Sequence, residues 1–82
     1  MTIDEYFAAH KTVHDFQDGE TVYLFVDGTG DVTTKLRRDS YFGPGYLFDD
    51  KGNCYGTLDW WLNPTGGCNG ISAPPDCEDY PI

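Results

Sequence analysis

Alternating hydrophobic and polar positions near the middle of the chain predict a β-hairpin. Residues 21–27 (TVYLFVD) are β-branched and aromatic, which is typical of strands, and Tyr23 and Phe25 would share one face. Because both faces of this segment are apolar, we expect the strand to be central in its sheet and covered on both sides. Residues 27–30 (DGTG) have the composition of a tight turn, and residues 31–38 form the predicted return strand.

A second hairpin is predicted further along, in the stretch that holds both tryptophans. Residues 46–48 form a short strand, residues 49–53 (DDKGN) a turn, and residues 54–62 (CYGTLDWWL) a longer strand. Neighbouring residues of a strand point to opposite faces. One of Trp60 and Trp61 should therefore enter the core, and the other should lie on the back of the sheet.

The N-terminal residues 2–14 are predicted to form a helix. Thr2 and Glu5 have the spacing of a capping box, which favours a helix start. The helix is expected to stop by residues 17–19 (QDG), which have a turn composition. One face of the helix would carry the residues spaced three and four apart, namely Ile3, Tyr6, Phe7, His10 and His14.

The C-terminal residues 63–82 differ from the rest because they are rich in proline and glycine, and they predict an irregular, acidic tail. Part of this tail is expected to lie over the outer sheet face, where Tyr23, Phe25 and Trp61 need cover. Residues 1–82 then form a single small acidic domain of the α+β class. Its predicted architecture is one N-terminal helix packed on a four-stranded antiparallel sheet made of two hairpins.

The net charge limits the possible partners. Fourteen aspartates and glutamates oppose five lysines and arginines, which gives −9 on 82 residues. Such a chain repels nucleic acids and anionic membranes, and it attracts basic proteins. The excess lies in residues 1–20 and 49–82, whereas residues 21–48 are balanced and have a basic edge at Lys35, Arg37 and Arg38.

Two acidic groups with nearby aromatic residues are therefore the predicted contact surface for a protein partner. Carboxylates on a rigid frame can imitate the regularly spaced phosphates of DNA, and aromatic residues favour the centres of protein interfaces. The candidate partner-binding residues are Asp15, Asp18, Glu20, Asp49, Asp50, Asp59, Asp76, Glu78, Asp79, Tyr41, Phe42 and Tyr55.

Metal and thiol chemistry are the alternatives to this interpretation. His10 and His14 are spaced to face one side of a helix, and Cys68 and Cys77 could complete a metal site. However, the chain has no CxxC or HExxH motif, and acids flank Cys77, which opposes a thiolate. A Cys68–Cys77 disulfide remains open for oxidising conditions, since three cysteines cannot all pair within one chain. We expect no catalytic residue, metal or cofactor.

The N-terminal residues have no pattern of a signal peptide, and no run of about 18 apolar residues occurs, so a cytoplasmic protein is expected. In size, charge and lack of a catalytic motif, the chain is similar to the small acidic counter-defence proteins of phages, such as anti-CRISPR proteins. The predicted function is a non-enzymatic inhibitor of a basic nucleic-acid-binding protein, and its most concrete form is a DNA mimic. The alternatives are an immunity protein that neutralises a toxin, or a small structural or virion assembly protein.

Overall fold

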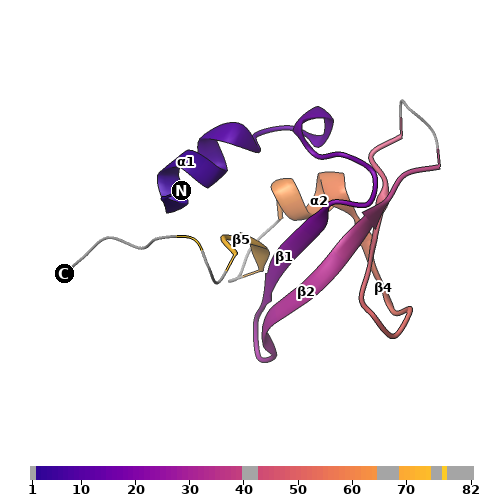
Figure 1. Ribbon diagram of the computed structural model, residues 1–82. Helices are drawn as coiled ribbons and strands as arrows, with labels where there is room; N and C mark the ends of the chain where they lie inside the picture. Colours follow the sequence, from indigo (N-terminus) through magenta and orange to yellow (C-terminus); the bar gives the residue numbers. More distant parts are fainter. Residues whose placement is uncertain (1, 40–42, 65–68, 75–76, 78–82) are drawn as a thin grey trace.

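The structure is a computed structural model that describes residues 2–39, 43–64, 69–74 and 77 (Figure 1). Its α+β class and its antiparallel sheet agree with the sequence prediction, but the number of strands and the position of the helices differ. Within the described residues, the elements in chain order are α1 (Ile3–Ala9), the 3₁₀ turn η1 (Val13–Asp15), β1 (Thr21–Val26), β2 (Gly30–Arg37), β3 (Tyr46–Phe48), β4 (Cys54–Thr57), α2 (Leu58–Leu62) and β5 (Gly70–Ser72).

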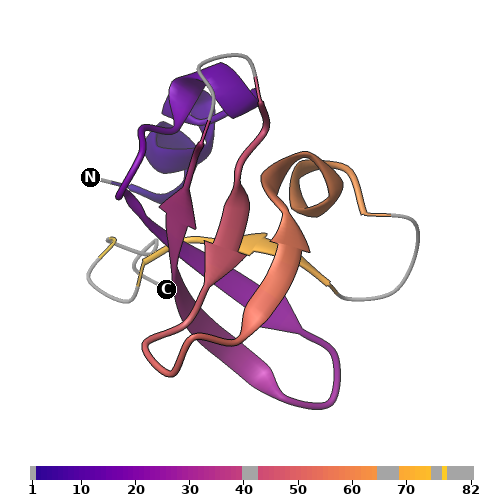
Figure 2. The same ribbon diagram turned by 90° about the vertical axis from the view of Figure 1, so that its right-hand side faces the viewer.

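The strands form one antiparallel sheet in the order β4-β3-β2-β1-β5. The predicted hairpins are both present, and β2 pairs with β3 to join them. Figure 2 shows the β3–β4 hairpin in front and the longer β1–β2 hairpin crossing behind it, as the natural twist of a sheet requires. The same view shows that α2 continues directly from β4.

One face of the sheet, called the inner face here, carries the hydrophobic core. The hydroxyl of Thr34, which is buried there, donates a 2.8 Å hydrogen bond to the main-chain oxygen of Val22, so its polar group is satisfied. Full burial of a large apolar side chain stabilises a fold by about 1.5–3 kcal/mol. The core residues, each at most 5% exposed, are Phe16, Val22, Leu24, Leu36, Leu47, Leu58 and Trp61.

The N-terminal helix begins as predicted but ends earlier. Thr2 and Glu5 form the capping box, with the amide of Glu5 donating to the Thr2 hydroxyl. Helix α1 ends at Ala9, because a second capping box between Thr12 and Asp15 starts the 3₁₀ turn η1. The carboxylate of Asp15 accepts hydrogen bonds from main-chain amides that a continuous helix would use internally.

The prediction of one strand over residues 54–62 is wrong in its second half. Strand β4 ends at Thr57, and residues 58–62 form α2. Leu58, Trp61 and Leu62 have helical spacing, and packing their shared face against the core outweighs continued strand pairing. Trp61 is 5% exposed and lies in the core, contrary to its predicted place on the outer face, whereas Trp60 is 42% exposed.

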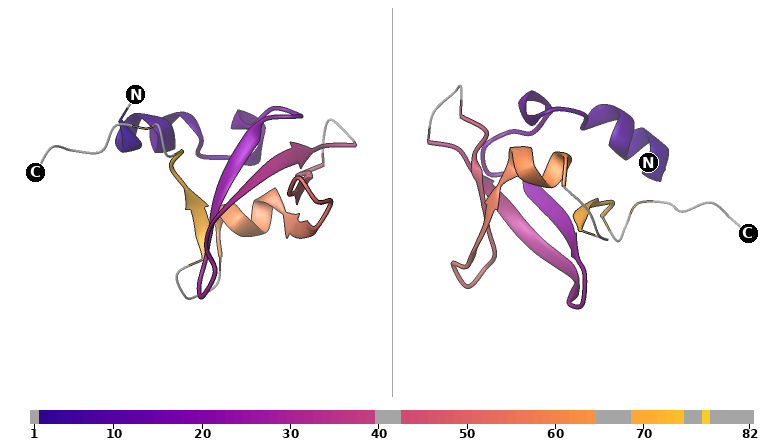
Figure 3. Two further views of the ribbon diagram at one scale, coloured as in Figure 1. Left: turned by 60° about the horizontal axis from the view of Figure 1, so that its bottom comes forward. Right: turned by 180° about the vertical axis from the view of Figure 1, so that it is seen from behind.

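The core helix is therefore α2, which lies across the sheet when the molecule is seen from behind (Figure 3). The prediction assigned this role to the N-terminal helix. Helix α1 instead reaches the core through a stack of rings, in which His10 lies between Tyr6 and the buried Phe16. The exposed positions on most of α1 explain why it forms no broad contact with the sheet.

The prediction that the whole C-terminal segment is irregular is also wrong. Residues 70–72 form β5, which pairs with β1 so that Leu24 lies opposite Ile71. Ile71 packs on the core, and its strand adds a fifth member to the sheet. The described part of the segment thus extends the sheet edge and leaves Phe25, on the outer face of β1, 39% exposed. Strand β1 is interior, as predicted, but it is not covered on both sides there.

Candidate functional site

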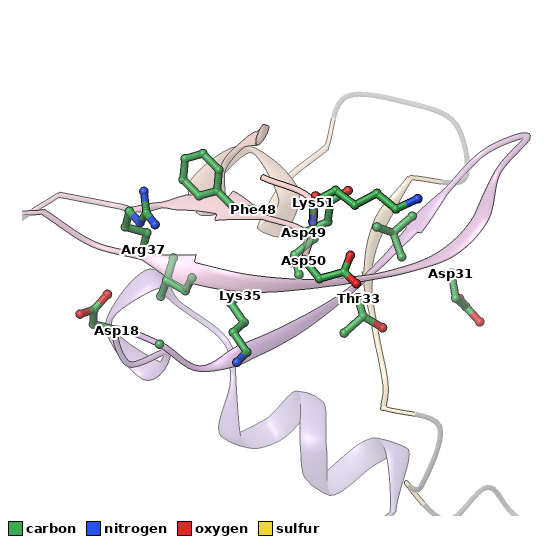
Figure 4. A pocket seen from close by; sticks show the side chains of 13 residues that line it. Asp18, Asp31, Thr33, Lys35, Arg37, Phe48, Asp49, Asp50 and Lys51 are labelled. Carbon is green, nitrogen blue, oxygen red and sulfur yellow. The ribbon is translucent and has the colours of Figure 1, made fainter. Parts of the chain in front are cut away.

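The face of the sheet opposite the core, called the outer face here, is hollowed along β2 and β3. Paired positions of neighbouring strands share a face, so the register brings Lys35 beside Phe48 and Arg37 beside Tyr46. The resulting outer groove encloses about 780 Å³. Its side chains include Asp18, Asp31, Thr33, Lys35, Arg37, Phe48, Asp49, Asp50 and Lys51 (Figure 4).

An aromatic ring and a guanidinium are in direct contact in the outer groove. The Cζ atom of Arg37 lies 4.9 Å from the ring centre of Phe48, a cation–π geometry. Both side chains project to the same side of β2 in Figure 4. Phe25 and Tyr46, on the same outer face, are 39% and 48% exposed, so this face combines apolar area with charge.

The charges of the outer groove nearly balance each other. Three of the five cations of the chain, Lys35, Arg37 and Lys51, line it together with four carboxylates. Within the described residues, none of these cations lies within ion-pair distance of a carboxylate; the ion pair found there joins His10 to Glu20 at 3.0 Å. Among the described residues, most of the excess negative charge therefore belongs to surfaces outside the outer groove.

Two predicted contact residues, Asp49 and Asp50, lie next to each other in the turn between β3 and β4. One oxygen of Asp49 accepts main-chain hydrogen bonds from Lys51 at 2.9 Å and Asn53 at 2.8 Å. Hydrogen bonds from Asn53, first from its side chain, lower the pKa of Asp49 below its ordinary value of 3.8. Asp49 thus holds the turn together, whereas Asp50 is exposed at the groove.

The three predicted contact residues of the N-terminal acidic group have separate structural positions. Main-chain hydrogen bonds from Thr12 and Lys11 lower the pKa of Asp15, which is exposed. Asp18 accepts a 2.9 Å hydrogen bond from the amide of Arg38 and lines the outer groove. Glu20 is half-buried against His10. Of the three, only Asp18 joins the residues around Asp49.

The remaining predicted contact residues are scattered or undescribed. Asp59 is exposed in the first turn of α2, away from the outer groove. Tyr55 is half-buried against the core, with its hydroxyl 3.5 Å from a carboxylate oxygen of Asp49. Tyr41, Phe42, Asp76, Glu78 and Asp79 lie outside the described residues.

The predicted basic edge is only partly exposed. Lys35 and Arg37 line the outer groove, but the guanidinium of Arg38 donates a 2.6 Å hydrogen bond to the main-chain oxygen of Val13 and is half-buried. Arg38 therefore fastens η1 to the end of β2. Asp31 and Lys51 also line the groove and were not predicted to do so, because strand register brings them there and no local motif indicates them.

The structure gives no support to the metal alternative. The ring nitrogens of His10 contact Tyr6 and Glu20, and His14 is exposed in η1. Among the described residues, no three histidine, cysteine or acidic side chains lie close enough to hold an ion. Cys54 is exposed at the outer end of β4, and Cys68 lies outside the described part of the chain, so its pairing is not described.

No helix in the described residues is long and apolar enough to cross a membrane. Comparison with protein-family models, curated proteins and solved structures finds no match to the chain.

Proposed function

We propose that the chain is a non-enzymatic, cytoplasmic inhibitor that binds a basic nucleic-acid-handling protein through its acidic surface. The observation that carries this proposal is the separation of charge on the molecule. Three of the five cations lie in the outer groove, and the guanidinium of a fourth, Arg38, donates a hydrogen bond to the main-chain oxygen of Val13. The surfaces outside the groove therefore present carboxylates with few opposing cations, and such surfaces attract basic proteins over long distances.

Some of these carboxylates are held in place by the fold. One oxygen of Asp15 accepts from the amides of Lys11 and Thr12, at 2.9 and 2.8 Å. The same hydrogen bonds, first that from Thr12, lower the pKa of Asp15, so they favour its ionised form. A charged group that is already ordered loses less conformational entropy when it binds. An exposed and ordered carboxylate such as Asp15 is therefore suited to contact lysine and arginine that would otherwise hold phosphates.

The concrete version of the proposal is a DNA mimic that occupies a nucleic-acid channel, in the manner of anti-CRISPR or anti-restriction proteins of phages. A toxin-neutralising immunity protein would use the same kind of acidic contact, and the identity of the captured partner distinguishes the two. A structural assembly protein is the second candidate, and the exposure of Phe25 and Tyr46 on one sheet face favours it.

The test is capture of partners from a host lysate with the intact chain as bait, with washes at low and high salt. The proposal expects a basic nucleic-acid-binding protein that is released as salt rises and that loses its DNA when the chain is added. Asp59→Asn, and a variant with Asp76→Asn, Glu78→Gln and Asp79→Asn, should each weaken binding. Asp31→Asn is the charge-matched control for Asp59→Asn, because it also removes one carboxylate and Asp31 lies in the balanced groove. A partner that high salt does not release would contradict the mimic.

A further inference from the structure

The outer groove differs from the rest of the molecule in its balance of charge, and therefore in the kind of partner that it fits. A chain of net charge −9 repels a second copy over most of its surface. The outer groove is where three cations meet four carboxylates, so repulsion between copies is weakest there. A patch that carries both signs of charge can also be complementary to itself, which a twofold contact requires.

The same face offers apolar area to bury. Among the described residues, four large hydrophobic side chains are exposed, and two of them, Phe25 and Tyr46, belong to the outer face. Phe48 lies on β3 opposite Lys35 of β2, under the guanidinium of Arg37. Two sheets that pack face to face bury such rings between them at a separation of about 10 Å.

Strand β2 has the charge order that a twofold contact needs. Asp31, Thr33 and Lys35 are exposed and alternate along β2, so all three point to the outer face. Asp31 and Lys35 are each two residues from Thr33, one before it and one after it. A twofold axis that lies between two facing sheets, at right angles to β2 and over Thr33, reverses the strand direction. It therefore brings Asp31 of each copy opposite Lys35 of the other.

We propose that the outer face is a homodimer interface in which two copies pack sheet to sheet, with Asp31 of each copy paired with Lys35 of the other. The dimer covers Phe25 and Tyr46 and leaves the acidic surfaces of both copies exposed. This proposal does not depend on the inhibitor function, because it concerns the purified chain alone. It also assigns a use to the exposed outer face of β1, which the described residues leave uncovered.

The test is the mass of the intact protein in solution, measured by sedimentation equilibrium from micromolar to millimolar concentration. Wild type should form a dimer. Asp31→Lys and Lys35→Asp should each raise the dimer dissociation constant by roughly tenfold or more, because each variant places like charges opposite each other. An equimolar mixture of the two variants should dimerise again, since one copy then presents two lysines along β2 to the two aspartates of the other.

Two substitutions outside the face serve as charge-matched controls. Asp59→Lys and Lys11→Asp change exposed residues on α2 and next to α1, and both should leave the dimer intact. Recovery of the dimer in the mixture also shows that both face variants are folded. Wild type that stays monomeric at all concentrations overturns the proposal. So does a dimer that survives Asp31→Lys and Lys35→Asp, because its interface must then lie elsewhere.

Discussion

The Nε2 atom of His10 lies 3.0 Å from a carboxylate oxygen of Glu20, and this contact joins the end of α1 to the residue before β1. The other ring nitrogen, Nδ1, lies 2.9 Å from the main-chain oxygen of Tyr6. Both oxygens accept hydrogen bonds, so both contacts form when each ring nitrogen carries a hydrogen. The ring centre also lies 4.7 Å from that of the buried Phe16. His10 therefore links α1 to the core.

Replacing His10 with alanine should lower the free energy of unfolding by roughly 1–3 kcal/mol, because it removes the partly buried hydrogen bonds and the ring packing. Urea unfolding followed by tryptophan fluorescence measures this change. His14→Ala is the control, because His14 is exposed and its effect should stay within about 0.5 kcal/mol. Equal midpoints for the two variants would mean that α1 is held by other contacts.

The phenol of Tyr6 is predicted to make stability depend on alkaline pH. Burial, and then the charges of Glu20, Tyr23 and Cys77, raise the pKa of Tyr6 from 10.0 to about 12. The raised pKa means that the folded state favours the neutral phenol. The contribution of Tyr6 to folding stability is therefore complete below pH 10 and is lost as pH rises to about 12. The Tyr6 hydroxyl is also buried, with no hydrogen-bond partner among the described residues.

Tyr6→Phe should therefore leave stability at pH 7 unchanged or raise it by up to about 1 kcal/mol, since it removes an unsatisfied hydroxyl. Its unfolding free energy should also fall less than that of wild type between pH 10 and 12. Urea unfolding across that range gives both quantities. Tyr46→Phe removes an exposed phenol and should keep the wild-type slope. A marked loss of stability at pH 7 in Tyr6→Phe would show that the hydroxyl has a partner.

The sequence predicts those elements whose signals are local. The capping box of Thr2 and Glu5, the hairpin turn at residues 27–30 and the alternation within β1 each depend on neighbours in the chain, and all three are present. Residues 54–62 gave conflicting signals, because two adjacent tryptophans suit a strand and the spacing of Leu58 and Trp61 suits a helix. The helix forms at residues 58–62 because it buries Leu58 and Trp61 together in the core.

The candidate site was less predictable, because it depends on contacts between distant segments. The pairing of Lys35 with Phe48, and the approach of Lys51 to the same groove, follow from the register between β2 and β3. A single sequence does not specify that register. Strand β5 was missed for the same reason, since Ile71 is one apolar residue in a polar segment and gains its partner Leu24 only in the folded chain.

Gly45 is predicted to tolerate a side chain less well than the other glycines in the described turns. Its φ of +84° is unfavourable for other residues, and an added Cβ would lie 2.6 Å from Cδ1 of the buried Leu36. Gly52 has a similar φ of +87° with open space around it, so Gly52→Ala measures the backbone effect alone, about 1–2 kcal/mol. The loss of unfolding free energy in Gly45→Ala should be about 1–3 kcal/mol larger than that in Gly52→Ala, as measured by urea unfolding. Equal losses would show that Leu36 moves aside freely.

Asp49 is predicted to make the fold sensitive to acid. Its pKa is lowered by hydrogen bonds from the side chain of Asn53 and from the amides of Asn53 and Lys51. The unfolded chain, with the ordinary pKa near 3.8, binds a proton at higher pH than the folded chain does. The contribution of Asp49 is therefore complete above about pH 4 and is lost as pH falls through the lowered value. The pKa of Asp15 is also lowered, so Asp15 too should lose a stabilising contribution as pH falls.

Asp49→Asn should lower stability at pH 7 and flatten its loss below pH 4, because asparagine keeps an acceptor oxygen but has no carboxylate to protonate. Urea unfolding from pH 7 to pH 2 measures both effects. Asp50→Asn removes the same charge from the neighbouring exposed position and should keep the wild-type acid slope. If the two variants lose stability in parallel below pH 4, acid sensitivity comes from overall charge and the hydrogen bonds of Asp49 are not its source.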